Sequence, residues 1–579
     1  MKSPRKWAVG GKRVALGLLL TMVAACSGTR SSYIPEDWRL IDEAAPVTAP
    51  GAMVSSVHPR ASEVGAAILR KGGNAVDAAV AVGFALAVVH PSAGNIGGGG
   101  FMIIRQNDGS TYALDYRETA PGLATRDMYL DSLGKLTDKS RVGHLAVGVP
   151  GSVAGLVEAQ RRFGNLTLPE VVEPAIRLAG DGFVLDRSRS RSLQGAARRF
   201  RLFEGSRKAF LLPNGDAPPP GTLFVQADLA RTLQAIADNG PSVFYEGWIA
   251  DLIVAEMERG GGLITKEDLA AYEAIWRDPV ELSYRDHTIY SMPPSSSGGI
   301  TMGQILNILE TFDSLPPFGS AEHMHILAEA MRRAFTDRNH FLGDPAYVEM
   351  PVEHLLSKEY AAAQRQTIDM ERVTVSTGLV PGRAESEETT HYSVVDADGN
   401  AVSVTTTLNG GHGSGVTVDG AGFLLNNEMD DFAGAPGQPN MYGLVQGAAN
   451  AIEPGKRMLS AMTPSIVLDP SGQLLMVLGS PGGPTIITTV AQVISNVVDH
   501  GMTLPEAIGA PRVHHQALPD RLNYENGGLL PSTVARLEAL GHEVDERRGT
   551  SGSVAGIIWA DSVWIGVHDP RSSGGSVGY

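Results

Sequence analysis

The stretch "EETTHYSVVDADGNAVSVTTTLN", residues 387–409, sets a threonine doublet between a loose acidic loop and a predicted β-hairpin. The hairpin consists of two runs rich in β-branched residues, joined by a turn at Asp398-Gly399. Threonine favours strands and strand edges, so the doublet alone indicates only where a strand begins. Whether the doublet also has a chemical role must be judged from the rest of the sequence.

The composition is that of a globular protein, since 43% of the 579 residues are hydrophobic and 19% are charged. Length alone suggests about three or four domains, although sizeable single α/β units exist. The formal net charge of −16 argues against nucleic acid as a partner, because nucleic acid binding uses clustered Lys and Arg. The negative charge is diffuse and bears on solubility rather than on partners.

The N-terminus has the design of a secretory signal, with the basic segment "MKSPRKWAVGGKR" followed by the apolar run "VALGLLLTMVAA". This run is too short to span a bilayer as a mature helix. It ends at Cys26, and "VAAC" resembles a bacterial lipobox, in which the cysteine becomes the lipidated first residue. An ordinary signal cut near Ala25 is the alternative. The sequence therefore predicts an exported, periplasmic lipoprotein, anchored in the outer membrane if the cell is Gram-negative.

Helices and strands are mixed along the rest of the chain. Residues 61–90 predict two Ala-rich helices broken at "KGGN", and residues 97–117 predict two strands around an Asn-Asp-Gly turn. Residues 150–290 are mainly helical, and two long helices follow at "MPPSSSGGI" and "AEHMHILAEAMRRAFTDRNHF".

After Thr389 the chain becomes strand-rich, and a helix is predicted from about Thr485. Besides the opening hairpin, strands are predicted at "GAGFLLNNEMDDF", "PSIVLDPSGQLLMVLGS" and "SVAGIIWADSVWIGVHDPR". Because strict βαβ alternation is missing, the order of elements indicates sheets layered between helices.

Three common kinds of site find little support. "NIGGGGF", residues 95–101, lacks the Lys-Ser/Thr of a P-loop and leads into a strand, so it indicates tight backbone packing. The histidines at 323–325 and 514–515 have no third ligand at metal-binding spacing, and Cys26 is the only cysteine. No G-x-S-x-G elbow offers a serine nucleophile. We therefore expect neither a metal nor a cofactor.

The segment "VLGSPGGPTIITTVAQVI" favours an anion site. A hydrophobic strand ends before two glycines, and Pro484 stands where a helix could begin. The backbone N–H groups of Gly482 and Gly483 would suit a developing oxyanion. A tight strand-to-helix turn is the alternative interpretation.

The segment "NNEMDDF" places Glu428, Asp430 and Asp431 after an apolar run that we expect to be a strand. Neighbouring carboxylates bind cations or ammonium groups. Without a metal motif, an ammonium group is the more economical interpretation. A surface loop of the same composition is the alternative.

The ordered motifs "DYRETAP", "MPPSSSGG", "TTHYSVVD…TLN", "LLNNEMDDF", "GSPGG", "PRVHHQALPD" and "DPRSSGGSVGY" resemble those of γ-glutamyltransferases, or glutathione hydrolases. The resemblance runs from about residue 45 to the C-terminus. It implies an N-terminal nucleophile hydrolase fold, a four-layer αββα sandwich made as one precursor and cut into two subunits. The implied segments are a signal peptide with lipobox at 1–26, a tether at 27–44, a large subunit at 45–388 and a small catalytic subunit at 389–579.

The resemblance gives the threonine doublet a role. A threonine hydroxyl is a poor nucleophile at neutral pH and needs a base. A cut between Glu388 and Thr389 would give Thr389 a free α-amine of near-neutral pKa beside its own hydroxyl. In the family, the first threonine of "TTH" carries out self-cleavage and then attacks the substrate. Thr407, in "TLN", resembles the threonine that hydrogen-bonds this nucleophile.

The family also implies a clamp for the γ-glutamyl group. Arg117 of "DYRE" would pair with the α-carboxylate, with help from Ser460. Asn409, Glu428 and Asp431 would hold the α-ammonium. The implied reaction acylates the nucleophile, releases a thiol peptide or an amine, and ends with transfer to water, an amino acid or a peptide.

Gly482 and Gly483 would then be the oxyanion donors. Residues 433–459 are long enough for the lid found in many family members, with Tyr442 as a candidate gate.

The chain departs from the family pattern at three positions. Ala461 follows Ser460 where the family commonly has a second serine, so one hydroxyl contact to the α-carboxylate is missing. His412 stands where an aromatic residue usually precedes "GSG", and Pro484 follows the glycine pair. The first two changes bear on the preference for glutathione.

Two rival interpretations stay open. A cephalosporin-acylase-like or poly-γ-glutamate-processing enzyme of the same fold would share the nucleophile without necessarily sharing the clamp, and Arg117 and Asp431 argue against the acylase. A lipoprotein that used the scaffold only for binding would be expected to lose Thr389 or Thr407, and both are present.

Overall fold

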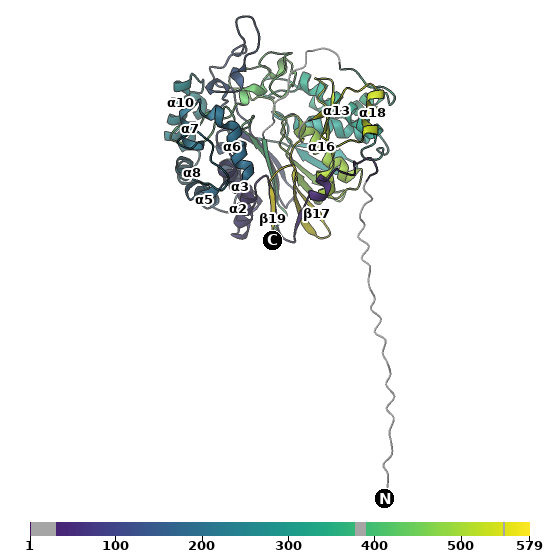
Figure 1. Ribbon diagram of the computed structural model, residues 1–579, viewed down its shortest axis with the longest axis horizontal. Helices are drawn as coiled ribbons and strands as arrows, with labels where there is room; N and C mark the ends of the chain where they lie inside the picture. Colours follow the sequence, from purple (N-terminus) through teal and green to yellow (C-terminus); the bar gives the residue numbers. More distant parts are fainter. Residues whose placement is uncertain (2–30, 377–388, 548–550) are drawn as a thin grey trace.

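Two seven-stranded sheets lie face to face between two layers of helices (Figure 1). The computed structural model describes residue 1 and residues 31–376, 389–547 and 551–579. The predicted αββα sandwich is confirmed within these residues. The predicted signal peptide, Cys26 and Glu388 lie outside them.

The nucleophile sheet, named for Thr389, combines strands from both sides of residue 388. Its order is β19 (Gly575–Gly578), β2 (Met53–Ser56), β10 (Thr389–Val395), β11 (Ala401–Thr407), β3 (Gly99–Arg105), β4 (Thr111–Tyr116) and β7 (Ile275–Arg277). Every neighbouring pair in it is antiparallel. The two predicted subunits would therefore share one sheet.

The facing sheet is also mixed in origin. Its order is β1 (Pro46–Ala49), β18 (Val563–His568), β17 (Ala555–Ala560), β13 (Leu474–Leu478), β12 (Ser465–Leu468), β9 (His287–Ser291) and β8 (Val280–Tyr284). Smaller sheets pair β14 (Val513–His514), β15 (Leu522–Glu525) and β16 (Val544–Arg547), and β5 (Phe183–Val184) with β6 (Leu223–Phe224).

Helices from the first half of the chain cover the nucleophile sheet, on the left in Figure 1. They are α2 (Pro59–Arg70), α3 (Ala75–Val89), α4 (Ser152–Phe163), α5 (Leu168–Gly180), α6 (Arg187–Phe200), α7 (Glu204–Phe210), α8 (Ala227–Asn239), α9 (Ser242–Tyr245), α10 (Trp248–Gly260) and α11 (Lys266–Ala270).

The helices on the side of the facing sheet come mainly from later in the chain. They are α12 (Gly298–Glu310), α13 (Ala321–Phe341), α14 (Val352–Leu356), α15 (Lys358–Gln366), α16 (Thr485–Val498), α17 (Leu504–Gly509) and α18 (Pro531–Ala539), with the short α1 (Leu40–Glu43) against α17. None of the helices in the described residues is both long and apolar enough to cross a membrane.

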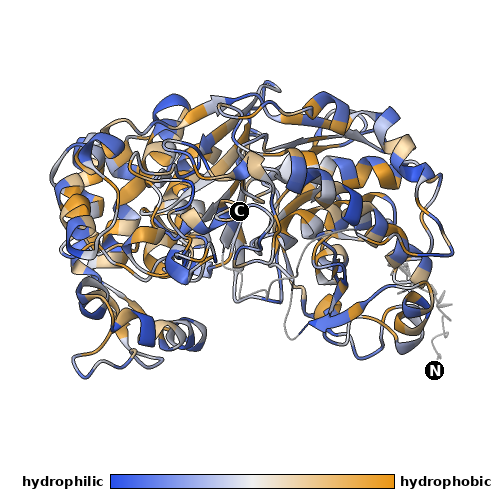
Figure 2. Ribbon diagram, turned by 90° about the horizontal axis from the view of Figure 1, so that it is seen from above, coloured by the Kyte–Doolittle hydropathy of each residue, from blue (hydrophilic) through white to orange (hydrophobic). Residues whose placement is uncertain are grey.

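Helix α3 is buried along its whole length, as its nearly unbroken apolar sequence predicts. Its first turn is closed by a capping box, in which Asn74 Oδ1 accepts from the N–H of Asp77 (3.0 Å) and the Asp77 carboxylate accepts from the N–H of Asn74 (3.1 Å). Figure 2 shows hydrophobic residues gathered along the strands and on the helix sides that face them.

Strand β3 shows how the two cores are separated. Phe101 and Ile103 pack in the core that spans the two sheets, whereas Met102 and Ile104 pack in the core under α3. Side chains alternate along a strand, so a strand buried on both faces reads as a continuous apolar run.

The prediction of close backbone packing at "NIGGGGF" is confirmed. A Cβ atom at Gly97 would lie 2.1 Å from the carbonyl oxygen of Leu424, and one at Gly98 would lie 2.1 Å from that of Thr407. No other side chain fits at these two positions. The glycines bring the start of β3 against the end of β11.

The prediction of a strand at "GAGFLLNNEMDDF" is wrong. The only ladder contact there among the described residues is an isolated bridge between Thr417 and Leu424, and Glu428–Asp431 form a 3₁₀ turn. The segment is apolar because it is buried, but its N–H groups bond to separate partners. Leu425, Asn426 and Asn427 donate to Val416, Gly97 and Leu408, respectively.

Candidate active site

One small cavity gathers ten of the eleven residues predicted for substrate chemistry. They are Arg117, Thr389, Thr407, Asn409, Glu428, Asp431, Tyr442, Ser460, Ala461 and Gly483. Gly482, the eleventh, directly precedes Gly483 in the chain. The cavity is also lined by Arg338 and by apolar side chains such as Leu459 and Ile486.

The β10–β11 hairpin places the two key threonines side by side. Thr389 is directly opposite Thr407 in the antiparallel register. Cβ atoms of such partners are about 4.5–5.5 Å apart, and they point to the same face. On that face of β10, Ser393 Oγ donates to the carbonyl of Ala555 in the facing sheet (2.9 Å), so Thr389 lies on the side between the sheets.

Asn409 turns the chain immediately after β11. Its φ of 73° is in the left-handed region that Asn tolerates better than most residues. Its N–H donates to Thr407 Oγ1 (2.8 Å), and its side-chain amide donates to the carbonyl of Asn427 (2.9 Å). These bonds join the end of β11 to the acidic turn that follows Asn427.

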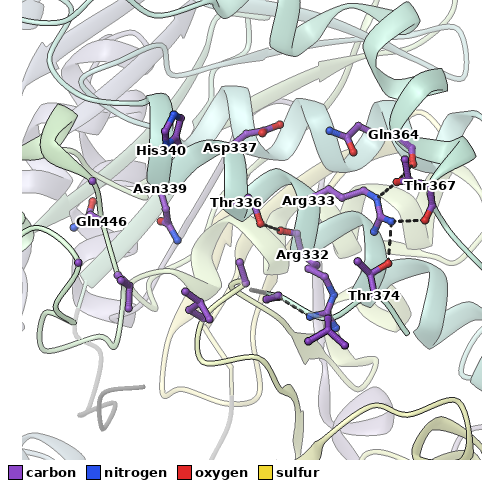
Figure 3. Close-up of a pocket in the computed structure, with 17 residues that line it drawn as sticks. Arg332, Arg333, Thr336, Asp337, Asn339, His340, Gln364, Thr367, Thr374 and Gln446 are labelled. Carbon is purple, nitrogen blue, oxygen red and sulfur yellow. Dashed lines mark hydrogen bonds between the residues drawn. The ribbon is translucent and has the colours of Figure 1, made fainter. Parts of the chain in front are cut away.

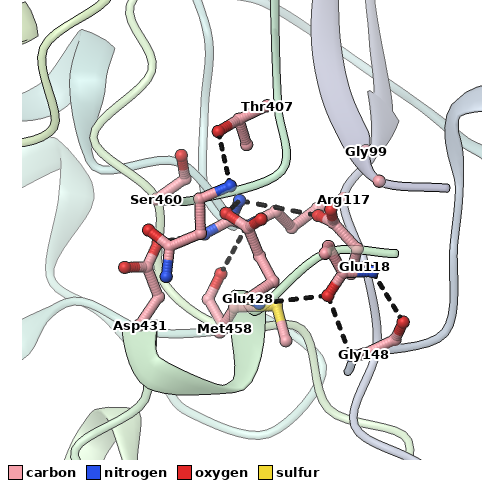
Figure 4. A network of polar contacts seen from close by, with 12 residues as sticks. Gly99, Arg117, Glu118, Gly148, Thr407, Glu428, Asp431, Met458 and Ser460 are labelled. Atoms are coloured by element: carbon pink, nitrogen blue, oxygen red, sulfur yellow. Dashed lines mark hydrogen bonds and ion pairs between the residues drawn. The ribbon is translucent and has the colours of Figure 1, made fainter. Parts of the chain in front are cut away.

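Arg117 lies at the centre of a buried charge network (Figure 4). Its terminal nitrogens donate separately to Glu428 and Asp431, and its Nε donates to the carbonyl of Met458 (3.2 Å). Glu118 adds a third carboxylate, 3.5 Å from Nη1. The side chain of Arg117 is fully buried, and buried charges are stable only when they are paired.

The acids of this network are harder to ionise than free carboxylates. Burial raises the pKa of Glu118 to about 7, although Arg117 opposes this shift. Burial also raises the pKa of Glu428 and of Asp431. For Arg117, burial acts to lower the pKa, but the nearby carboxylates outweigh it and raise the pKa. The guanidinium therefore stays charged while the acid cluster retains proton-binding capacity near neutral pH.

The predicted turn after β13 contains two residues with positive φ angles, a conformation that glycine adopts readily. Gly482 and Gly483 have φ of 132° and 53°, and α16 begins after Pro484. No described residue accepts a hydrogen bond from either glycine N–H. The turn thus presents two backbone donors beside a helix N-terminus.

Tyr442 lines the cavity beside Asn409. Its hydroxyl group contacts Asn409, 2.5 Å from Oδ1 and 3.0 Å from the carbonyl oxygen. The remaining cavity measures about 20 Å³, which is room for about one water molecule.

A family model described as Gamma-glutamyltranspeptidase matches residues 61–579. The glutathione hydrolase proenzyme of Escherichia coli (strain K12) is 48% identical over 571 residues, which are 97% of both chains. This chain belongs to the gamma-glutamyltranspeptidase family. The fold of the family therefore extends over nearly all of the described residues.

Two solved structures support the same placement. Cephalosporin acylase from Bacillus halodurans matches with a TM-score of 0.82 at 28% identity, over 92% of this chain and 97% of that chain. Helicobacter pylori gamma-glutamyltranspeptidase matches with a TM-score of 0.54 at 47% identity, over 55% of this chain and 91% of that chain. The second match corresponds to about half of the present chain.

Of the departures from the family pattern, Ala461 and Pro484 line the cavity, whereas His412 does not. His412 is buried edge-on against Phe200, with ring centroids 5.2 Å apart. The expectation that His412 bears on substrate preference therefore loses its support, because the side chain lies away from the cavity.

Sequence reasoning missed two charged residues of the site, Glu118 and Arg338. Glu118 follows Arg117 directly, so an acid next to the predicted clamp arginine was an available signal. Arg338 stands in the last turn of a long helix and has no local signal. Its contacts with Ser297 and Gln446, which are distant in the sequence, hold it at the cavity.

A larger cavity of about 500 Å³ lies beside the last turns of α13 (Figure 3). Its lining includes Arg332, Arg333, Asn339 and Gln446. It contains none of the eleven predicted residues, which gather in the smaller cavity. The two cavities are adjacent, because Gln446 of the larger one accepts from Nη1 of Arg338 (3.4 Å), which lines the smaller one.

Among the described residues, no group of three or more His, Cys, Asp or Glu side chains is placed to hold a metal ion.

Proposed function

We propose that this protein is an exported γ-glutamyltransferase and glutathione hydrolase. Thr389 accepts the γ-glutamyl group of glutathione and related compounds, and water, an amino acid or a peptide then removes it. The observation that carries the proposal is the shared cavity of Thr389 and Thr407 with the Arg117 network. Assays with glutathione and a chromogenic γ-glutamyl amide, with and without a dipeptide acceptor, test it. Absence of γ-glutamyl release would refute it.

Activation of the nucleophile requires a free N-terminus. We propose that the precursor cuts itself between Glu388 and Thr389, so that the new α-amine, with a pKa of roughly 8, takes the proton from the Thr389 hydroxyl. Thr407 orients that hydroxyl from the neighbouring strand. The resulting chains, 45–388 and 389–579, stay together because β10 pairs with β2 and β11 pairs with β3.

The substrate clamp is assigned to Arg117 and its neighbours. A guanidinium has five N–H groups, and three of those in Arg117 bond to Met458, Glu428 and Asp431. Of the two remaining N–H groups, one on each terminal nitrogen, Nη1 also lies 3.5 Å from Glu118; we assign the substrate α-carboxylate to these donors. Ser460 supports the same carboxylate.

The α-ammonium of the substrate is assigned to Asn409, Glu428 and Asp431. Asn409 Oδ1 accepts from the Tyr442 hydroxyl in this structure, and movement of the proposed lid at 433–459 would free this acceptor. The N–H groups of Gly482 and Gly483 stabilise the oxyanion of the tetrahedral intermediate.

Glutaryl transfer is the second candidate activity, because the structure is similar to a cephalosporin acylase over 92% of the chain. A glutaryl group lacks the α-amino group, so it would bring no ammonium group to Asn409, Glu428 and Asp431. We expect γ-glutamyl substrates to be used in preference to glutaryl ones. Equal kcat/KM for the two substrate classes would favour the acylase.

The Ala461→Ser variant should bind γ-glutamyl substrates a few-fold more tightly. Ala461 lines the cavity next to Ser460, and a neutral hydroxyl contact contributes roughly 0.5–1.5 kcal/mol. The KM for glutathione, measured by steady-state hydrolysis, should fall a few-fold if the added hydroxyl group fits in the cavity. An unchanged or higher KM would mean that position 461 does not face the α-carboxylate.

Export and anchoring are proposed from the sequence alone, through lipidation of Cys26. Wild-type protein should partition with membranes, and Cys26→Ala should be released in soluble form or fail to mature. Fractionation with mass analysis of the N-terminal peptide measures this. Equal solubility of both proteins, with no added lipid mass, would rule out the anchor.

A further inference from the structure

The cavity contains a second guanidinium, that of Arg338. The side chain comes from the last turn of α13 and is 1% exposed. It lies among the residues that line the cavity together with Thr389, Arg117 and Ser460. Nothing in the sequence or the proposed reaction has so far given it a role.

Every hydrogen bond of Arg338 within the described residues goes to a neutral group. Nε donates to Ser297 Oγ (2.9 Å), and Nη1 donates to Asn339 Oδ1 (3.0 Å) and Gln446 Oε1 (3.4 Å). No carboxylate among these residues forms an ion pair with it. The two N–H groups of Nη2 have no partner there either.

This pattern is unusual for a buried arginine. Buried guanidinium groups are normally compensated by a carboxylate, because an isolated charge is costly in a low-dielectric interior. Burial lowers the pKa of Arg338 to about 10, with the charge of Asp431 opposing the shift. Arg338 is therefore a charged, incompletely satisfied donor at neutral pH, whereas Arg117 is surrounded by three acids.

We propose that Arg338 binds the α-carboxylate of the γ-glutamyl group together with Arg117. This inference rests on the proposed function and adds a substrate-binding residue to it. The α-carboxylate supplies the anion that Arg338 lacks, and the free Nη2 donors supply the contact.

The neighbours of Arg338 favour the α-carboxylate over other anions. Ser297 Oγ accepts from Arg338 and donates to the carbonyl of Ser460 (2.6 Å), so the guanidinium is fixed relative to the segment that supports the carboxylate. Asp431 interacts with both arginines. An α-amino acid places its ammonium and its carboxylate side by side, which matches an acid flanked by two guanidiniums.

The position of Ala461 gives a second reason. A serine in its place would supply a hydroxyl to the carboxylate, and this chain lacks that hydroxyl. Arg117 already bonds to Met458, Glu428 and Asp431, and Glu118 lies 3.5 Å from its Nη1, so few of its N–H groups are left for a carboxylate. The α-carboxylate has two oxygens, each of which can accept more than one hydrogen bond. Arg338, which lines the same cavity, supplies the additional cationic donor.

The test compares two substrates that differ only at the α-carbon: a chromogenic γ-glutamyl amide and its analogue with the α-carboxylate converted to a carboxamide. Arg338→Gln should lower kcat/KM for the carboxylate substrate by tenfold or more and change that for the carboxamide by less than threefold. Arg338→Lys should recover part of the difference. The matched control is Arg333→Gln on the same helix, which should leave the ratio of the two substrates unchanged.

Equal losses for both substrates in Arg338→Gln would overturn the proposal and make the residue structural. If the carboxamide is turned over too slowly, competitive inhibition by L-glutamate and by its α-amide gives the same ratio. If Arg338→Gln does not fold, Arg338→Met serves as the neutral variant, and a preference for the carboxylate equal to wild type in either assay would refute the proposal. If the wild-type protein itself shows no γ-glutamyl activity, the proposed function is refuted instead.

Discussion

The Thr389→Ala variant is expected to remain one uncut chain with no measurable γ-glutamyl transfer. Alanine removes the hydroxyl that is proposed to attack the preceding peptide bond and later to carry the γ-glutamyl group. Removal of a catalytic nucleophile lowers the rate by roughly 10⁴-fold or more in well-studied hydrolases. Denaturing electrophoresis of the purified protein and hydrolysis of a chromogenic γ-glutamyl amide check the two effects.

Thr390→Ala is the matched control, since the two threonines are neighbours in one strand. Thr390 faces the opposite side of β10, and its hydroxyl has no hydrogen-bond partner among the described residues. This variant should be cut and active, while Thr389→Ser should still process slowly. Cleavage of Thr389→Ala at the same bond, or full activity of an uncut wild-type chain, would refute self-cleavage by Thr389.

The Arg117→Ala variant should raise the KM for glutathione tenfold or more. A charge-assisted hydrogen bond contributes about 1.5–3 kcal/mol, and about 1.4 kcal/mol is a factor of ten in binding. The same change leaves Glu118, Glu428 and Asp431 buried without their cation, which costs roughly 3–5 kcal/mol of folding stability. Steady-state kinetics and thermal unfolding measure the two losses separately.

Arg117→Lys keeps the positive charge but not the planar guanidinium. Its folding stability should therefore fall less than that of Arg117→Ala, while its affinity for γ-glutamyl substrates should still be reduced. A glutaryl substrate, which lacks the α-amino group, serves as the second comparison. If Arg117→Ala leaves γ-glutamyl kinetics unchanged and the glutaryl substrate works equally well, the amino-acid clamp is wrong. The acylase activity would then be the better interpretation.

Local patterns in the sequence were sufficient for the elements that carry the nucleophile. The β10–β11 hairpin follows from β-branched alternation around Asp398-Gly399, and the burial of α3 follows from its apolar run. The order of elements indicates sheets layered between helices, but the four-layer αββα sandwich is implied only by the family resemblance, since no local pattern states that strands before and after residue 388 share one sheet. Strand β19 was missed because "GSVG" has little strand propensity and is held by pairing with β2.

Site residues that belong to a short sequence motif were predictable. Residues that reach the cavity only through the packing of distant segments were not. Thr407 and Asn409 follow from "TLN", and Glu428 and Asp431 follow from "NNEMDDF". Arg338 lies in a helix whose polar residues look like an ordinary amphipathic pattern, and its burial depends on contact with residues 297 and 446. The segment before Glu428 was misassigned because burial on all sides produces the same apolar run as a strand.

Covalent labelling of the nucleophile tests the proposed mechanism most directly. An electrophilic glutamine analogue traps the residue that attacks the γ-carbonyl position, and fragmentation mass spectrometry locates the label. We predict one label per active site, on Thr389 at the N-terminus of the 389–579 chain, with activity lost in proportion to labelling. Complete inactivation with Thr389 unlabelled, or with the label on another residue, would contradict the mechanism.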